Sequence, residues 1–473
     1  MNGRAGRTGT PHILIVGGGY VGMYTALGLQ RSLKRSQARI TVIDPRSYMT
    51  YQPFLPEAAA GALEPRHVVV PLRRVLKRCN VITGEVTSIS HATKSVTVKP
   101  EIGDEYELGY DIIVVALGSI SRTLPIPGLA EVGIGFKQIE EAIALRNHVL
   151  DRLDVAASTT DPEVRKRALT FVFVGGGFAG VEALGELEDM ARYALRYYPQ
   201  LQPRDMRWVL VEAAGRILPE VGPEMGEYTV VELSKRDIEI RLETLLQSCV
   251  DGHVVLSKGK PFDADTIVWT AGVKANPVLA NSDLPLDEKG RLRCLPELRV
   301  DGLDDAWAAG DNAAVPDLSA GQPGVYTAPN AQHAVRQAKL LAKNIIADLE
   351  GGLPKPYKHK YIGSVASLGL YKGVAHTYGI KVRGFAAWFM HRTYHMSKMP
   401  TFNRKFRVVV DWTLALVFKR EVVTLGRMRM PREDFRRAAQ PITPRPVQPP
   451  VEGSAAERPE EHAGTAGGRL PRG

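Results

Sequence analysis

The sequence predicts an α/β fold, because one strand–turn–helix unit occurs in it twice. The first unit has an apolar run at residues 12–16, the turn Gly17-Gly18-Gly19-Tyr20-Val21-Gly22 and a helix expected at 20–32. The second unit has an apolar run at 169–174, the turn Gly175-Gly176-Gly177-Phe178-Ala179-Gly180 and a helix expected at 178–197. Two G-x-G-x-x-G turns in this setting predict two Rossmann-like dinucleotide-binding domains.

The three glycines of each turn have different expected roles. Gly17 and Gly175 make the tight turn, and Gly22 and Gly180 let the helix pack closely on the strand. The middle glycines let the backbone approach a pyrophosphate, which then lies at the N-terminus of the helix. These middle positions are Gly19 and Gly177.

Three acidic residues follow strands, at places where a bound dinucleotide needs a hydrogen-bond acceptor. Asp44 lies 22 residues beyond Gly22, and Glu212 follows the apolar run 209–211. A carboxylate at this place accepts a ribose 2′-hydroxyl and repels a 2′-phosphate, so Glu212 favours NADH over NADPH, although Arg216 is close in sequence. Asp311, at a strand end and helix start, is expected to bond the ribityl chain of FAD.

Composition excludes several other classes of protein. The three cysteines (Cys79, Cys249 and Cys294) are far apart, so neither a metal site nor a redox-active cysteine pair is expected. The chain shows neither a signal peptide nor an apolar run of the roughly 18 residues that a transmembrane helix needs. We therefore expect a protein on the cytoplasmic side of the cell membrane.

The excess of positive charge is local. Residues 378–437 hold fourteen Lys and Arg against four Asp and Glu, whereas the rest of the chain is balanced. Two amphipathic stretches, 384–399 and 405–420, lie in this segment and combine basic residues with an apolar face. On 384–399 the expected apolar face holds Phe385, Trp388, Phe389, Met396 and Met399, with His391, Arg392, His395 and Lys398 largely on other faces.

Such stretches suit helices that lie in an anionic membrane interface. The alternatives are packing on the protein itself or on a second subunit. Nucleic acid is not expected as a partner, because a phosphate backbone prefers an evenly basic surface.

These features together predict six segments along the chain. They are a flexible N-terminus (1–10), the first part of an FAD-binding domain (11–122), an NADH-binding domain (123–290), the second part of the FAD-binding domain (291–350), a C-terminal sheet with amphipathic membrane-anchoring helices (351–437), and a disordered tail (438–473).

The order of several short segments resembles that of a known family. These segments are 51–56 with Ala60-Gly61, then 115–119, 126–128, 177–182, 269–273, 309–311 and 331–334. From about residue 11 to 430 the chain resembles the type II NADH:quinone oxidoreductases, non-proton-pumping flavoproteins with a glutathione-reductase-like fold. The resemblance implies FAD and NADH as cofactors, a quinone (menaquinone or ubiquinone) as acceptor, a membrane-associated C-terminal segment and a homodimer. It adds Gln52, Gly118 and Gly272 to the expected cofactor-binding residues, and it places Glu182 close to where nicotinamide meets flavin.

The residues expected at the acceptor depart from the family pattern. The family carries two glutamines four apart on the helix that lines the quinone pocket. Here Gln332 is retained, Arg336 takes the second place and Gln337 follows it. Arg336 either donates to a quinone carbonyl or indicates a different acceptor. Lys372 lies in a stretch that the family places near the flavin.

Two alternatives to a quinone-reducing enzyme stay open. One is a flavoenzyme with another acceptor, such as a soluble one or that of a sulfide:quinone reductase, although the latter needs a cysteine pair that this chain lacks. The other is a nicotinamide-sensing flavoprotein without rapid turnover.

Overall fold

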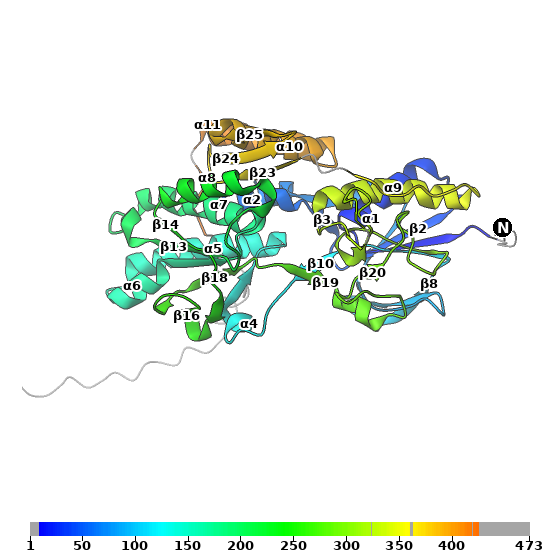
Figure 1. Cartoon of the computed structure of the whole chain (residues 1–473), viewed down its shortest axis with the longest axis horizontal. Coiled ribbons are helices and arrows are strands. Elements are labelled where there is room, and N and C mark those ends of the chain that lie inside the picture. The colour runs from blue at the N-terminus through cyan, green and yellow to red at the C-terminus, as the bar shows by residue number, and fades with distance from the viewer. Residues whose placement is uncertain (1–8, 323, 360–362, 419, 425–473) are drawn as a thin grey trace, which may run out of the picture. The chain divides into compact units, whose positions relative to one another are not determined.

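Two five-stranded parallel sheets organise the molecule (Figure 1). The computed structural model describes residues 9–322, 324–359, 363–418 and 420–424. Three predicted segments, 1–10, 291–350 and 351–437, therefore lie partly outside the described residues, and a fourth, 438–473, lies outside them entirely.

The first sheet has the strand order β21-β9-β1-β2-β5, and every neighbouring pair is parallel. Its strands are β1 (His12–Val16), β2 (Arg39–Asp44), β5 (Asn80–Thr83), β9 (Ile112–Val115) and β21 (Ala306–Ala308). Helices α1 (Tyr20–Ser32) and α9 (Ala331–Leu349) pack against each other beside this sheet. Apart from the exposed Arg39 and the half-buried Asp44, β1 and β2 are buried throughout, as parallel strands covered on both faces require.

The second sheet repeats this plan with the order β11-β18-β12-β13-β14. Its strands are β11 (Gly133–Gly135), β12 (Thr170–Val174), β13 (Arg207–Val211), β14 (Ile238–Arg241) and β18 (Thr266–Trp269). The long helices beside it are α5 (Ile139–Ser158), α7 (Phe178–Ala194) and α8 (Pro223–Ser234). The two repeated units therefore confirm the predicted α/β fold, whereas the domain boundaries at 122 and 290 stay predictions.

Several smaller sheets and short helices accompany the two main sheets. The antiparallel sheets are β6 (Glu85–Ser90) with β7 (Ser95–Lys99) and β8 (Tyr106–Gly109); β15 (Leu246–Ser248) with β16 (His253–Leu256) and β17 (Phe262–Asp263); β3 (Tyr48–Thr50) with β4 (Val69–Pro71); and β10 (Ser119–Ser121) with β19 (Val273–Ala275). β20 (Leu292–Arg293) pairs in parallel with β22 (Ala313–Ala314). The short helices are α2 (Leu55–Ala59), α3 (Leu72–Val75), α4 (Leu129–Val132) and α6 (Pro162–Ala168).

The C-terminal part of the described chain is an antiparallel sheet followed by two helices. The sheet holds β23 (Gly363–Ser367), β24 (Gly373–Thr377) and β25 (Ile380–Arg383), and the helices are α10 (Gly384–Lys398) and α11 (Phe402–Val417). β23 contacts α7, and α10 packs on β23 and β24. This arrangement brings a late segment of the chain against the helix that follows the second glycine turn (Figure 1).

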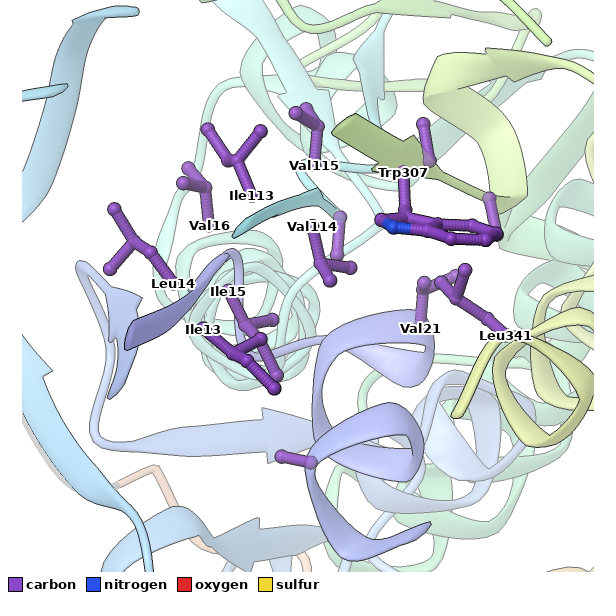
Figure 2. Packing of buried hydrophobic residues seen from close by; sticks show 14 of the residues in the cluster. Ile13, Leu14, Ile15, Val16, Val21, Ile113, Val114, Val115, Trp307 and Leu341 are labelled. Carbon is purple, nitrogen blue, oxygen red and sulfur yellow. The ribbon is translucent and has the colours of Figure 1, made fainter. Parts of the chain in front are cut away.

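Each sheet has its own apolar core. Around the first sheet, Ile15 and Val114 are fully buried with Trp307 of β21 and Leu341 of α9 (Figure 2). The core on the helix side of the second sheet also takes in Met399, directly after α10, and Val408 of α11. Both C-terminal helices are therefore anchored to the rest of the protein by apolar burial.

Candidate functional site

Both glycine turns have the geometry that a bound pyrophosphate requires. Gly17 has a φ of +105°, and a Cβ there would lie 2.3 Å from the carbonyl oxygen of Ala116. A Cβ at Gly22 would lie 1.7 Å from the carbonyl oxygen of Gly17, so helix and turn touch. A Cβ at Gly19 would meet nothing within 4 Å, which leaves the start of α1 open to a ligand.

The second turn repeats these three relationships. Gly175 has a φ of +116°, and a Cβ at Gly180 would lie 2.0 Å from the carbonyl oxygen of Gly175. A Cβ at Gly177 would meet nothing within 4 Å. Both turns therefore fit a dinucleotide at the N-terminus of the helix that follows.

The two ribose-binding candidates lie at matching places beside the turns. Asp44 accepts hydrogen bonds from the backbone N–H groups of Gly18 (2.6 Å) and Arg46 (2.7 Å). Glu212 accepts them from the N–H groups of Gly176 (2.6 Å) and Ala214 (2.7 Å). Burial raises the pKa of Asp44 above its ordinary value. Each carboxylate is thus fixed at the strand end where a ribose hydroxyl would bind.

Two cavities lie between these elements, and they meet. The Gly17 cavity has a volume of about 230 Å³ and is bordered by Gly17, Gly19, Asp44 and Gly118. The Glu182 cavity has a volume of about 360 Å³ and is bordered by Phe178, Glu182, Gly272, Gln332 and His395. Four residues border both cavities: Gln52, Lys137, Asp311 and Ala331. A ligand in the first cavity therefore extends to the wall of the second.

A short polar chain lies at this boundary. Ser119 donates a hydrogen bond from Oγ to Oδ2 of Asp311 (2.6 Å), and Lys137 donates from Nζ to the same Oγ (2.6 Å). Burial lowers the pKa of Lys137, although Asp311 and Glu141 oppose this effect. Lys137 was missed in the sequence, because it belongs to no motif and reaches the site only through the fold.

Gln332, Arg336 and Gln337 have three different environments. Gln332 borders the Glu182 cavity and donates from Nε2 to the carbonyl oxygen of Gly363 (3.3 Å). Arg336 donates from Nη1 to the backbone oxygen of Gln332 (3.1 Å) and to its Oε1 (3.3 Å). The structure therefore places Arg336 behind Gln332, where it holds the amide in position.

Gln337 is fully buried and holds the turn that carries Asp311. Its Oε1 accepts from the N–H of Gly310 (2.7 Å), and its Nε2 donates to Oγ1 of Thr327 (3.1 Å). Lys372 lies in the turn between β23 and β24, half-buried. Among the described residues, neither Gln337 nor Lys372 borders the Glu182 cavity.

Glu182 contacts the C-terminal segment. Its Oε1 accepts from the N–H of Ser367 (2.9 Å) and lies 3.0 Å from Nε2 of His391 on α10. Glu186, one turn further along α7, accepts from Oγ of Ser367 (3.0 Å). Burial raises the pKa of Glu186, and Glu57 adds to this effect.

The expected apolar face of α10 is corrected by these contacts. Trp388 and Met399 are buried, whereas Phe385 and Phe389 are exposed, so the five apolar residues do not share one environment. His391 and Arg392 were placed with the polar faces but are buried, because carboxylates on α7 and α2 face them. No local pattern in the sequence signals these pairs, because the carboxylates that face His391 and Arg392 lie far away along the chain, on α7 and α2.

A second buried ion pair ties both C-terminal helices to α2. Arg392 lies 2.9 Å from Oε2 of Glu57, and Trp412 of α11 donates from Nε1 to the same oxygen (2.9 Å). The ring of Trp412 meets that of Phe54 edge-on at 5.8 Å. The segment that borders the cavity at Gln52 is thus directly followed by residues that contact α11.

Comparison with known proteins agrees with this geometry. Residues 11–338 match the sequence profile of the pyridine nucleotide-disulphide oxidoreductase family. The chain is 30% identical to the type II NADH:quinone oxidoreductase Ndh of Mycobacterium tuberculosis, over 86% of this chain and 88% of that protein. It is 32% identical to the type II NADH:quinone oxidoreductase of Staphylococcus haemolyticus, over 80% of this chain and 93% of that protein.

A solved structure extends the likeness to the fold. The structure of NDH2 from Plasmodium falciparum in complex with NADH superposes with a TM-score of 0.81 at 18% identity, covering 88% of this chain and all of that one. The matches confirm the predicted fold class, the assignment as a flavin-dependent NADH dehydrogenase, and FAD and NADH as cofactors. The chain therefore belongs to the type II NADH:quinone oxidoreductases, within the pyridine nucleotide-disulphide oxidoreductase family.

Proposed function

We propose that this protein is a peripheral membrane enzyme that oxidises NADH and passes two electrons through FAD to a membrane quinone, menaquinone or ubiquinone. The observation that carries the proposal is the meeting of the two cavities at Gln52, Lys137, Asp311 and Ala331. The residues of the first glycine turn would hold the pyrophosphate of FAD and those at the boundary its ribityl chain, and the Glu182 cavity would then take a nicotinamide or an acceptor.

The residues at the boundary have roles that follow from their contacts. FAD, when bound, supplies the ring that accepts a hydride and passes electrons on. Asp311, held by Ser119, is the acceptor for the ribityl hydroxyls, and Lys137 places a cation where negative charge develops. Gly272, with a φ of +90° and no atom within 4 Å of a Cβ position, keeps one wall of the Glu182 cavity open.

The remaining site residues are proposed to act on the acceptor. Glu182 and Gln332 border the cavity, where the Gln332 amide can donate a hydrogen bond to a quinone carbonyl and Glu182 can donate one in its protonated form. Arg336 positions the Gln332 amide, and Gln337 supports the Asp311 turn. Lys372 keeps only the role that the family resemblance implies, a place near the flavin.

The proposed membrane surface is formed by apolar side chains of α10 and α11 that point away from the protein. Phe385 and Phe389 are 58% and 56% exposed, and Phe402 is 83% exposed. Other exposed residues of α11 are Phe406, Val409, Leu414, Leu416 and Val417. Basic residues accompany them, at Lys398, Arg404, Lys405 and Arg407. A contiguous apolar surface with flanking cations suits an anionic membrane interface.

No helix in the described part of the chain is both long enough and apolar enough to cross a bilayer. In the proposed arrangement α10 and α11 lie on the cytoplasmic side of the membrane, and the enzyme is a homodimer, as the family resemblance implies. Analytical ultracentrifugation of the holoenzyme in detergent tests the dimer, since a monomer at micromolar concentration would contradict it.

Substitution of Phe402 and Phe406 by Ser tests the membrane surface without disturbing the core. Each Phe contributes about 1.5–3 kcal/mol when buried, so the double variant should bind vesicles at least about tenfold more weakly. Flotation with phosphatidylglycerol vesicles measures this binding. The matched control is Ile102→Ser with Leu353→Ser, since both side chains are highly exposed elsewhere.

Unchanged flotation of the Phe variant, or an equal loss in the control, would contradict the assignment of the membrane surface. Deletion of the whole stretch 384–430 is a poorer test, because it also removes the buried residues Trp388, His391 and Arg392.

A further inference from the structure

A histidine and a carboxylate form a buried ion pair at the wall of the Glu182 cavity. His391 is 2% exposed, and its Nε2 lies 3.0 Å from Oε1 of Glu182, which borders the cavity. His395, one turn further along α10, borders the same cavity, and its ring centroid lies 4.6 Å from that of His391. The pair therefore connects a buried titratable group to the place where an acceptor would bind.

The charges around His391 favour its protonated form. From α7 it faces Glu182 and Glu186, and from α2 it faces Glu57. The cations near these carboxylates are Arg392 on α10 and Arg420, which follows α11. Burial alone would lower the pKa of His391, but the three carboxylates raise it above its ordinary value.

His395 has the opposite electrostatic environment. Burial, together with the neighbouring charge of His391, holds the pKa of His395 well below its ordinary value. Its backbone oxygen accepts a hydrogen bond from Oη of Tyr51 (3.0 Å). Of the two histidines, His391 is thus the one whose surroundings favour the protonated form, and the surroundings of His395 favour the neutral form.

We propose that His391 holds the proton that completes acceptor reduction and passes it to Glu182, whose carboxyl group delivers it into the cavity. This inference rests on the proposed quinone reductase function. His391 does not border the cavity and acts on the acceptor only through Glu182, so it is a positioning residue.

The proton balance of the reaction requires such a source. A quinone becomes a hydroquinone by taking up two electrons and two protons. The hydride of NADH accounts for both electrons and one proton. The N–H bond at Nε2 of His391 breaks as an O–H bond forms on Glu182. That O–H bond then breaks as the proton moves to the quinone oxygen, where the final O–H bond forms. His391 is left neutral and regains a proton from water.

The orientation of the ring is compatible with proton exchange. Neither ring nitrogen of His391 has an aligned hydrogen-bond partner within the described residues, although Nε2 is within ion-pair distance of Glu182. The imidazole is therefore held by charge and by packing rather than by fixed hydrogen bonds, so a rotation of the ring brings the N–H towards the carboxylate.

The test separates the two half-reactions of the holoenzyme by anaerobic rapid mixing between pH 5.5 and 9. NADH reduces the flavin first, and a water-soluble menaquinone analogue then reoxidises it. In the unmodified enzyme the reoxidation rate should fall as pH rises through the raised pKa of His391, because only the protonated form delivers a proton. His391→Gln should lose this pH dependence and slow reoxidation about a hundredfold, while flavin reduction stays within about twofold.

A second readout does not depend on activity. NMR titration of ¹³C-labelled histidines in the oxidised holoenzyme should show one imidazole, absent in His391→Gln, with a midpoint above 6.5. Glu182→Gln should move this midpoint down, since the nearest carboxylate is neutralised. The matched control is His253→Gln, which removes a histidine from an exposed pair with Asp263.

Each contrary outcome has a definite meaning. If His391→Gln keeps the pH dependence of the unmodified enzyme, or the imidazole titrates at or below 6.5, the role of His391 is wrong while the proposed function stands. If the unmodified enzyme is reduced by NADH but never reoxidised by the quinone, the proposed function itself fails, and this inference fails with it. If His391→Gln does not retain flavin, the NMR titrations of the unmodified enzyme and of Glu182→Gln still test the role of His391.

Discussion

At the scale of single residues, Asp44 and Glu212 are site residues that the local sequence predicts. Each lies at the end of the strand that follows its glycine turn, and each accepts a hydrogen bond from a backbone N–H of that turn. The glycines were predictable for the same reason, since a Cβ at Gly22 or Gly180 would strike its own turn. Lys137 and His391 were not predictable, because they enter the site from segments far away in the sequence.

Replacement of Glu212 by Ala should narrow the preference for NADH over NADPH by about tenfold, a change of about 1.4 kcal/mol. The physical reason is that the carboxylate accepts a hydrogen bond from the ribose 2′-hydroxyl of NADH and repels the 2′-phosphate of NADPH. Steady-state kcat/KM for the two nucleotides measures it. Glu227→Ala, on the exposed side of α8, is the control, and an unchanged ratio in Glu212→Ala would remove Glu212 from the site.

Gln337→Leu should destabilise the protein by about 1–3 kcal/mol, since the N–H of Gly310 would lose its acceptor in a buried place. It should also weaken FAD binding, because the same turn carries Asp311. Urea unfolding and flavin titration measure the two effects. Gln247→Leu on the exposed face of β15 is the control, and equal stability of the two variants would refute the supporting role.

At the scale of elements, the sequence predicted regular structure well and helix faces less well. The helix expected at 20–32 is α1 with the same bounds, and the stretch 384–399 contains α10. The predicted environment of the α10 side chains was wrong in part, because periodicity shows which residues share a helix face but not what that face packs against. His391 and Arg392 read as polar surface, yet buried carboxylates on α7 and α2 pair with them.

The same contacts couple the C-terminal helices to the cavity. Arg392 and Trp412 share one oxygen of Glu57, which follows the cavity residue Gln52 by five positions. Trp412→Phe keeps the packing on Phe54 but removes the donor to Glu57. We expect it to raise the KM for the quinone analogue severalfold without changing the rate of flavin reduction, and a change confined to flavin reduction would contradict this coupling.

At the scale of the whole molecule, two dinucleotide-binding units and a basic C-terminal segment combine into one electron path. The first sheet carries the Gly17 cavity, and the second carries the turn that opens towards Glu182. Helix α10, which borders the Glu182 cavity, also carries part of the exposed apolar surface. The net charge of +10 comes from residues 378–437, part of which lie outside the described residues, and the proposed membrane surface would draw on this charge for its attraction to anionic lipid.

Anaerobic rapid mixing tests whether electrons pass from NADH through the flavin to a quinone. The purified holoenzyme is mixed with NADH while the oxidised flavin band is followed, and a menaquinone analogue is then added. We expect fast bleaching followed by fast recovery of the band. Bleaching without recovery would contradict it, because the protein would then hold both cofactors but use a different acceptor.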